Sequence, residues 1–298
     1  MPPAKRVEVE VEGRRLSLSN LGKVMYPAVG FTKGQVIDYY TRIAPFVLPH
    51  LRDRPLTLKR YPNGVEGGHF YEKQAPSHRP EWVEVAPIEL RSKTINFVLC
   101  NDLSTLVWLA NLADLELHPS LSLADDINRP SVMAFDLDPG PGTGLVECAE
   151  VAFLLRDALS QLKLESFAKT SGSKGIQVYV PLNVQDVDYD HGSKALSHAL
   201  ARHLEAQHPK LIVSQQKKEL RANKVLIDWS QNDEHKTTVG VYSLRARDRP
   251  TVSTPVTWEE LEDPSALVFD AGDVLERVEA HGDLFAPVAE LQQELPDL

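Results

Sequence analysis

The chain has 298 residues, of which 42% are hydrophobic and 25% are charged, the composition of an ordinary globular protein. This composition excludes a disordered tail, a collagen-like repeat and a coiled-coil rod, and no apolar run approaches the roughly 20 residues that span a membrane. The formal net charge of −10 argues at first against a nucleic-acid partner, but residues 250–298 alone carry −11, whereas residues 1–80 hold thirteen bases against seven acids. An acidic C-terminal segment therefore hides a mildly basic body.

The first half of the chain is predicted to hold short strands and two helices. Residues 6–18 alternate valine with glutamate, the period of a half-exposed strand, which a turn or bulge at Arg14–Arg15 interrupts. Apolar residues at helical spacing predict helices over 33–50 and 101–115. The segment TLKRYPNG predicts a strand that ends near Tyr61, at a Pro-Asn-Gly turn.

The second half alternates strands and helices more regularly. Strands are predicted over 131–138, 175–182 and 224–230, and helices over 145–163 and 191–207. The acidic segment from about residue 257 is expected to wrap back as helices. This alternation predicts an α/β (α+β) fold, with an N-terminal lobe over residues 1–125 and a C-terminal lobe over residues 126–298.

The cysteines and the N-terminus predict the compartment. Only Cys100 and Cys148 occur, too few for a disulfide framework and compatible with a reducing cytoplasm. The first fifteen residues lack the apolar stretch of a secretory signal. We therefore expect a cytoplasmic protein with no membrane partner.

The motif Phe135-Asp136-Leu137-Asp138-Pro139-Gly140 is the sharpest local signal in the sequence. Side chains two residues apart on a strand point to the same face, so both aspartates are expected on the face opposite the apolar residues. Two neighbouring carboxylates repel unless a cation lies between them, and Mg²⁺ or Mn²⁺ prefers such oxygen ligands. The alternative is a pair of solvated acids on an exposed strand face.

Asp228 adds a third acid, within the apolar strand KVLIDWS. Three carboxylates on neighbouring strands can hold two metal ions about 3.5–4 Å apart, an arrangement that serves phosphoryl transfer. The alternative for Asp228 is a buried acid that is satisfied by a helix cap or by an arginine.

The segment Thr170-Ser171-Gly172-Ser173-Lys174-Gly175 combines glycines, hydroxyls and a lysine before a strand. Such a loop can bind phosphate oxygens through amides and side-chain donors, although it lacks the spacing of a Walker A loop. Beside the three acids it predicts a nucleoside triphosphate site, with Arg221, Lys224, Arg245 and Arg247 to balance charge. Taken alone, such a segment is a plain turn.

Aromatic and basic residues mix around Tyr61, Phe70 and Tyr71, with Lys59, Arg60 and Lys73 nearby. This mixture suits base stacking combined with phosphate contact, or else an edge of the core covered by long basic side chains. The sequence contains no HExxH, paired CxxC or GxSxG motif, so we expect neither a structural zinc site nor a serine hydrolase.

Taken together, these motifs resemble the polymerase domain of bacterial ligase D, a family of the archaeo-eukaryotic primase superfamily that acts in non-homologous end joining. The resemblance runs from about residue 16 to residue 285 and implies a two-lobed primase-like fold, whose mixed or antiparallel catalytic sheet is flanked by helices. The matching blocks, in family order, are LSNLGKVMYP, RPLTLKRYPNG, HFYEKQ, FDLDPG, TSGSKG, LRANKVLIDWSQN and KTTVGVYSLRAR.

The resemblance also implies roles for single residues. Matches to the acids that hold two Mn²⁺ or Mg²⁺ ions are Asp136, Asp138 and Asp228. Matches to nucleotide contacts are Ser171, Lys174, His118, Arg221, Gln231 and Arg245, with Lys59 near the cleft. Matches to a pocket for the 5′-phosphate of the downstream strand are Asn20, Lys23 and Lys33, and matches to aromatics that stack on bases near the template are Phe70 and Tyr71.

One position departs from the family, in which the phosphate loop usually continues as Ser-Gly-Ser-Lys-Gly-x-His. Here the last position is Gln177. Glutamine keeps a donor but cannot carry charge, so we predict that activity survives with weaker nucleotide binding or a changed pH dependence.

The expected function is that of a DNA-directed nucleotidyltransferase that extends 3′ ends and fills short gaps by two-metal phosphoryl transfer. The resemblance implies a preference for ribonucleotides among NTP and dNTP substrates, a location at the nucleoid, and as partners DNA with 5′-phosphorylated gaps or breaks, Ku and an ATP-dependent ligase. The sequence has no KxDG-type adenylation motif, which predicts a polymerase without the ligase half. Two alternatives stay open: a primase that starts chains without a primer, and a non-catalytic scaffold that bridges DNA ends.

Overall fold

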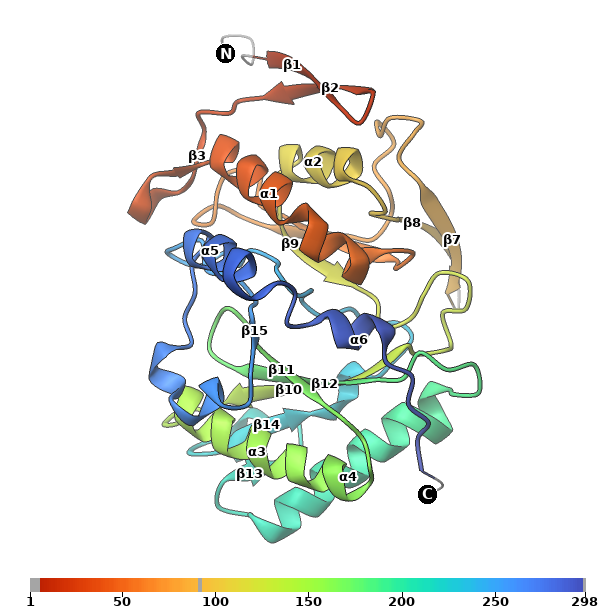
Figure 1. The fold of residues 1–298 in the computed structure, drawn as a ribbon, viewed down its shortest axis with the longest axis vertical. Coiled ribbons are helices and arrows are strands. Elements are labelled where there is room, and N and C mark those ends of the chain that lie inside the picture. Colours follow the sequence, from red (N-terminus) through yellow and green to blue (C-terminus); the bar gives the residue numbers. More distant parts are fainter. Residues whose placement is uncertain (1–5, 91–92, 297–298) are drawn as a thin grey trace.

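Two β-sheets and the helices that cover them make up the computed structural model, which describes residues 6–90 and 93–296 (Figure 1). The first sheet has the strand order β6-β5-β8-β7, and β9 also pairs with β5. Its strands are β5 (Leu56–Arg60), β6 (Phe70–Glu72), β7 (Val85–Leu90), β8 (Lys93–Val98) and β9 (Asp114–Pro119). Helices α1 (Lys33–Leu51) and α2 (Leu103–Asn111) pack against each other, and α2 packs on β9.

The second sheet has six strands in the order β13-β14-β10-β12-β11-β15. The strands are β10 (Val132–Pro139), β11 (Phe167–Thr170), β12 (Ile176–Pro181), β13 (Ile212–Val213), β14 (Val225–Asp228) and β15 (Pro255–Val256). Only β13 and β14 pair in parallel, so the sheet is mixed. Helices α3 (Leu145–Gln161) and α4 (Lys194–Gln207) cover one of its faces (Figure 1). The predicted α/β (α+β) class is therefore confirmed.

The remaining elements surround these two layers. Two hairpins precede α1, and two helices follow the second sheet: β1 (Arg6–Val11) with β2 (Arg14–Ser19), β3 (Val24–Tyr26) with β4 (Phe31–Thr32), then α5 (Ala271–His281) and α6 (Ala286–Glu290). Short helical turns are η1 (Pro27–Val29), η2 (Tyr189–Ser193), η3 (Lys218–Leu220), η4 (Trp229–Gln231), η5 (Glu260–Glu262) and η6 (Pro264–Ala266). Within the described ranges, no helix is long and apolar enough to cross a membrane.

Several predicted boundaries are wrong by a few residues. The first hairpin turns at Glu12–Gly13, where both residues have positive φ, and Arg14–Arg15 lie inside β2 rather than in a turn. Helix α2 ends at Asn111 instead of residue 115, since Ala113 has a φ of 61° and turns the chain into β9. Helix α4 begins at Lys194 rather than residue 191, because the wider turn η2 precedes it.

The core explains why β10 presents its aspartates outward. Met133, Phe135 and Leu137 are fully buried in the hydrophobic cluster between the second sheet and helices α3 and α4. Burial of each such side chain stabilises the fold by roughly 1.5–3 kcal/mol, so a shift of β10 by one residue would cost several times that amount. The alternation of the strand therefore places Asp136 and Asp138 on the opposite face.

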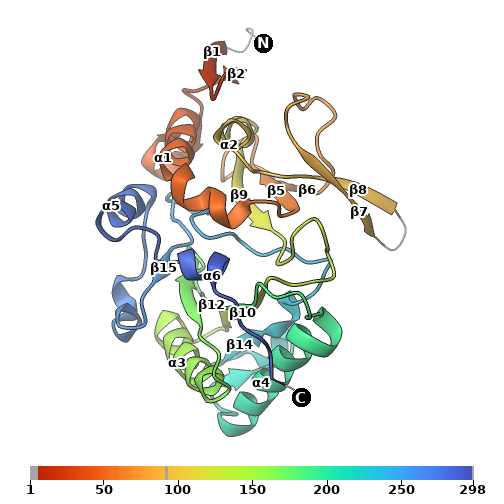
Figure 2. The same ribbon diagram turned by 45° about the vertical axis from the view of Figure 1, so that its right-hand side comes forward.

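The C-terminal helices connect the two halves. Helices α5 and α6 follow the second sheet in the chain, yet both pack against α1, as the blue and orange ribbons show in Figures 1 and 2. Because α5 and α6 from the end of the chain pack on α1 near its beginning, the division into two lobes at residue 125 stays a prediction.

Candidate nucleotide and metal site

A row of polar residues crosses the second sheet on the face opposite the buried cluster. Asp136 on β10 lies directly opposite Gln177 on β12 and directly opposite Asp228 on β14. Gln177 in turn lies opposite Lys169 on β11. Directly opposed residues of antiparallel strands share a face, so four strands bring these residues together from positions up to 92 apart in the sequence.

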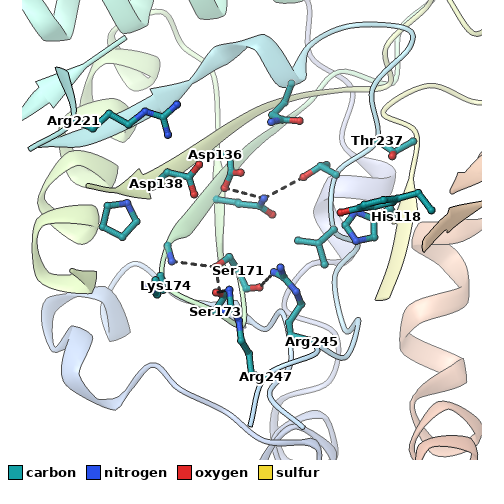
Figure 3. Close-up of a pocket in the computed structure, with 17 residues that line it drawn as sticks. His118, Asp136, Asp138, Ser171, Ser173, Lys174, Arg221, Thr237, Arg245 and Arg247 are labelled. Carbon is teal, nitrogen blue, oxygen red and sulfur yellow. Dashed lines mark hydrogen bonds between the residues drawn. The ribbon is translucent and has the colours of Figure 1, made fainter. Parts of the chain in front are cut away.

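Asp136 and Asp138 line a cleft of about 530 Å³, across which the phosphate loop faces them (Figure 3). Burial and the nearby charge of Asp138 raise the pKa of Asp136 to about 7, against a hydrogen bond of 3.0 Å that Gln177 Nε2 donates to Asp136 Oδ1. Burial and the charge of Asp228 likewise raise the pKa of Asp138. Burial contributes most to these shifts, and the remainder includes repulsion between the carboxylates, which a cation would relieve.

The carboxylate of Asp228 is engaged in its own turn. Oδ1 accepts hydrogen bonds from Ser230 N and Ser230 Oγ, at 3.0 and 2.6 Å, and Oδ2 accepts one of 2.7 Å from Gln231 Nε2. The described part of the chain accordingly contains no group of three acidic, histidine or cysteine side chains gathered as metal ligands. These hydrogen bonds fit the alternative in which Asp228 caps its own turn. To bind a metal ion, the carboxylate of Asp228 would have to give them up.

The donor set nevertheless fits hard divalent cations. Asp136, Asp138 and Asp228 offer oxygen atoms only, which Mg²⁺ and Mn²⁺ prefer. All three lie on adjacent strands, and Asp138 and Asp228 each raise the pKa of the carboxyl next to them. The residues that would hold the metal are therefore close to one another before any ion binds.

Glycine is required twice in the phosphate loop because other backbone segments approach it closely. Gly172 has a φ of 64°, and a Cβ atom there would lie 2.5 Å from the carbonyl carbon of Val252. A Cβ at Gly175 would lie 2.2 Å from the carbonyl oxygen of Leu137. The loop is thus packed directly against β10, the strand that carries the aspartates.

Hydrogen bonds hold the same loop in a tight turn. Ser171 Oγ accepts from the amides of Ser173 and Gly175, at 3.3 and 3.1 Å. The guanidinium of Arg245 donates to the carbonyl of Ser171, and that of Arg247 donates to Ser173 Oγ. Two arginines therefore lie beside the loop, where they could neutralise phosphate charge.

Most of the predicted nucleotide contacts line this one cleft. The predicted residues in its lining are Tyr71, His118, Ser171, Lys174, Gln177, Arg221, Gln231 and Arg245, together with Asp136 and Asp138. Ser173 and Gly175 of the predicted phosphate loop also line the cleft, and the sequence did not single out Thr237, Thr238 and Val239, which line it too. Arg247, which was predicted to balance triphosphate charge, also lines the cleft.

Lys59 does not line the cleft but contacts its wall. The wall is organised by Glu116, a buried residue of β9 that sequence reasoning missed, and Lys59 Nζ lies 3.1 Å from Glu116 Oε2. His118 lies two residues further along β9 and also contacts Glu116. A signal was present in the sequence, because acids at 114 and 116 and the histidine at 118 alternate along an otherwise apolar strand.

The two predicted stacking aromatics are exposed on β6. Phe70 and Tyr71 are 43% and 58% exposed, a high fraction for large apolar rings. Arg60 lies over the ring of Phe70 and Lys59 over that of Tyr71, at 5.2 and 5.4 Å. Only Tyr71 reaches the cleft.

The candidate 5′-phosphate residues form a separate cationic site at the start of α1. Lys33 is 6% exposed, and its Nζ donates to the carbonyl and hydroxyl of Ser19, at 2.7 and 3.2 Å. Burial and the charges of Lys23 and Arg60 lower the pKa of Lys33 to about 8. Asn20 adjoins this site in a left-handed turn, with a φ of 54°. The ammonium is thus held among neutral and cationic groups, which an anion would stabilise.

Comparison with known proteins places this geometry in a family. The model of the LigD primase-polymerase domain matches residues 32–285. The chain is 43% identical over 276 residues to the multifunctional non-homologous end joining protein LigD of Mycolicibacterium smegmatis, covering 92% of this chain and 36% of that protein. Against the corresponding DNA repair protein of Mycobacterium tuberculosis the identity is 40% over 291 residues, covering 93% and 38%. The chain therefore spans less than two-fifths of the length of these relatives.

A solved structure covers the chain almost completely. The polymerase domain of Mycobacterium tuberculosis ligase D in complex with DNA superposes with a TM-score of 0.88 and 38% sequence identity. The match covers 94% of this chain and 99% of that one.

Proposed function

The chain belongs to the primase-polymerase domain family of ligase D, and from this membership we propose that it is a nucleotidyltransferase that extends DNA 3′ ends and fills short gaps during non-homologous end joining. One observation carries the proposal: Asp136 and Asp138, beside Asp228, face a phosphate-binding loop across a single cleft. Phosphoryl transfer needs acids that hold metal next to groups that hold a triphosphate.

The residues of the cleft have separate roles. The triphosphate lies against Ser171, Lys174 and Gly175, and its charge is balanced by Arg245 and the other basic residues of the lining. Two Mg²⁺ or Mn²⁺ ions, held by Asp136, Asp138 and Asp228, would stabilise charge on the attacking and leaving oxygens. Gln177 fixes one oxygen of Asp136 by hydrogen bonding, which leaves the other oxygen for the cleft.

Two further surfaces hold the DNA, one at the edge of this cleft and one at the start of α1. Phe70 and Tyr71 stack on bases near the template, and Lys23 and Lys33 receive the 5′-phosphate of the downstream strand. By family membership the substrates include ribonucleotides and deoxyribonucleotides, with ribonucleotides preferred, and the partners include Ku and an ATP-dependent ligase at the nucleoid. A scaffold without catalysis has no use for three neighbouring carboxylates, so we favour the enzyme.

Extension of a primed, gapped duplex tests the proposal, with Asp228→Ala as the critical variant. We expect the variant to lose more than about 100-fold in extension rate, because metal ions contribute several kcal/mol of transition-state stabilisation. Its affinity for DNA should change little. The matched control is Asp157→Ala, an exposed aspartate of α3, which should extend normally. Extension by Asp228→Ala at the rate of wild type would refute the metal assignment, and labelled products on unprimed single strands would favour the primase.

A further inference from the structure

Glu116 is a buried carboxylate that several residues around the cleft contact. It is 2% exposed, and five donors from three parts of the chain surround its two oxygens. Oε1 accepts from Tyr61 OH and Ala246 N, at 2.9 and 3.2 Å. Around Oε2 lie Lys59 Nζ at 3.1 Å, His118 Nε2 at 3.1 Å and Arg245 Nε at 3.3 Å.

This arrangement decides which nitrogen of His118 carries its proton. Burial opposes ionisation of Glu116, but the hydrogen bond from His118 and the charges of Arg245 and Lys59 outweigh it and hold the pKa of Glu116 well below its usual range. An ionised carboxylate can only accept hydrogen bonds. The proton must therefore reside on Nε2 of His118, the nitrogen that faces Glu116.

The other nitrogen of His118 is left as an acceptor. Burial, the largest effect, lowers the pKa of His118 despite the neighbouring Glu116, so the imidazole is neutral at pH 7 and has a single proton. Nδ1 makes no hydrogen bond within the described chain, and His118 lines the cleft beside Thr237 (Figure 3). The ring also meets the edge of Tyr71, with centroids 5.9 Å apart.

We propose that Glu116 is a positioning residue that fixes His118 in its Nε2–H tautomer, so that the cleft wall accepts a hydrogen bond from a sugar hydroxyl of the bound nucleotide. The inference rests on the proposed function and specifies the chemistry of one position in it. At neutral pH the outer oxygens of a triphosphate are acceptors, so they cannot pair with a bare Nδ1. Donors on the nucleotide are the sugar hydroxyls and the base N–H groups, and template pairing engages the latter.

Replacement of Glu116 by leucine should reverse the polarity of His118. Leucine offers no acceptor to the donors that surround Oε2 in wild type, which are His118 Nε2, Lys59 Nζ and Arg245 Nε. Lysine and arginine can only donate, so a bare Nε2 beside them is favoured and the proton of His118 moves to Nδ1. The variant would thus present a donor to the cleft in place of an acceptor.

Nitrogen-15 spectra of the histidine rings test this directly in the full chain. In wild type we expect a protonated Nε2 and a bare Nδ1 for His118, identified by the loss of its signals in His118→Ala. Glu116→Leu should show the opposite tautomer. Asp114→Asn, which alters another buried carboxylate of β9 that does not contact His118, should leave it unchanged. A protonated Nδ1 in wild type would overturn the proposal, and this outcome does not depend on the folding of the Glu116 variant.

The second test measures nucleotide binding in the absence of a primer. Wild type should bind a ribonucleoside triphosphate about 3- to 10-fold more tightly than the analogue that lacks the contacted hydroxyl, and the 2′-deoxy and 3′-deoxy forms identify which hydroxyl that is. This ratio should fall to about 1 in His118→Ala, whereas a loss of phosphate contacts alone would weaken all three ligands equally and leave the ratio unchanged. An unchanged ratio in His118→Ala contradicts the inference. Failure of wild type to extend any primer would instead contradict the proposed function, without affecting the tautomer result.

Discussion

Gln177 joins a buried cation to a carboxylate of the metal site. Lys169, fully buried, donates from Nζ to Gln177 Oε1, to Ser253 Oγ and to the carbonyl of Val239, at 2.5, 2.7 and 3.1 Å. Gln177 Nε2 donates to Asp136 Oδ1. When both groups are charged, the ammonium cannot accept and the carboxylate cannot donate, so the amide of Gln177 then has only one orientation.

A neutral histidine at position 177 could meet the same demands, with one nitrogen accepting from Lys169 and the other donating to Asp136. We therefore expect Gln177→His to extend primers, with its triphosphate affinity within about 10-fold of wild type. Gln177→Leu should lose more than about 10-fold in affinity, because it removes one buried hydrogen-bond partner from Lys169 and one from Asp136. Titration of each variant with nucleotide measures this. Wild-type affinity in Gln177→Leu would show that the amide has no role in the site.

Single residues were predictable from the sequence where the signal was local. The spacing of Asp136 and Asp138 fixes their common face by strand geometry alone. The local pattern around Glu116 marks a polar strand face but could not show the role of this residue, because its partners Lys59 and Arg245 lie 57 and 129 positions away in the chain. The rotamer of Asp228 was equally inaccessible, since it depends on how η4 begins.

At the scale of elements, periodicity predicted which segments are helices and strands but not how the strands pair. Helix α1 and strand β12 fall almost where their apolar patterns placed them. The register that sets Asp136 against Asp228 depends on pairing between β10 and β14, with α3, β11, β12 and α4 between them in sequence. Such non-local pairing has no local sequence signal, and family resemblance supplied what the patterns could not.

The segment after α5 is fastened to α1 by Asp283. Its Oδ2 lies 2.8 Å from His50 Nε2, and its Oδ1 accepts from Tyr242 OH at 2.7 Å and from the amide of Phe285 at 2.9 Å. Burial opposes ionisation, but the hydrogen bond from His50 and these further bonds keep the pKa of Asp283 below its usual value. One carboxylate thus ties α1, the 242 turn and the C-terminal segment together.

Asp283→Asn should lower the free energy of unfolding by roughly 1–3 kcal/mol at pH 7. A carboxyl whose folded pKa is depressed stabilises the protein above its unfolded pKa of about 3.9, and this contribution is lost as pH falls through the folded value. The difference between variant and wild type should therefore shrink below about pH 4. Urea denaturation at pH 7 and at pH 3.5 measures it, with the exposed Asp186→Asn as control. A difference that stays constant down to pH 3.5 would contradict the assignment.

At the scale of the whole molecule, we expect DNA binding to depend on local positive charge, because the net charge of the protein is negative. The protein carries −10 overall, yet residues 1–80 carry an excess of six positive charges. Part of the acidic C-terminal segment is paired internally, as in the contacts of Arg277 with Glu260 and of Arg249 with Asp270. Exposed charges further apart than about 8 Å are largely screened at physiological salt, so we expect DNA to respond to the basic site near α1 rather than to the net charge.

This balance predicts how the protein distinguishes gaps. Because Lys33 is nearly buried beside Lys23 and Arg60, a 5′-phosphate there relieves repulsion, and wild type should extend a primer faster on a 5′-phosphorylated gap than on a 5′-hydroxyl gap. Lys23→Ala with Lys33→Ala should remove this preference while extension on the hydroxyl gap, which reports on folding, continues. The control is Lys163→Ala with Lys210→Ala, two exposed lysines outside the site, which should keep it.

The dependence of DNA affinity on salt concentration tests the mechanism behind this prediction. Each phosphate contact contributes about one unit to the slope of log affinity against log salt concentration. The slope for 5′-phosphorylated gaps should therefore exceed that for hydroxyl gaps in wild type, and the two slopes should converge in the Lys23/Lys33 double variant. A preference that persists in the double variant with both slopes unchanged would place 5′-phosphate recognition elsewhere on the molecule, since a net charge of −10 cannot by itself attract the DNA.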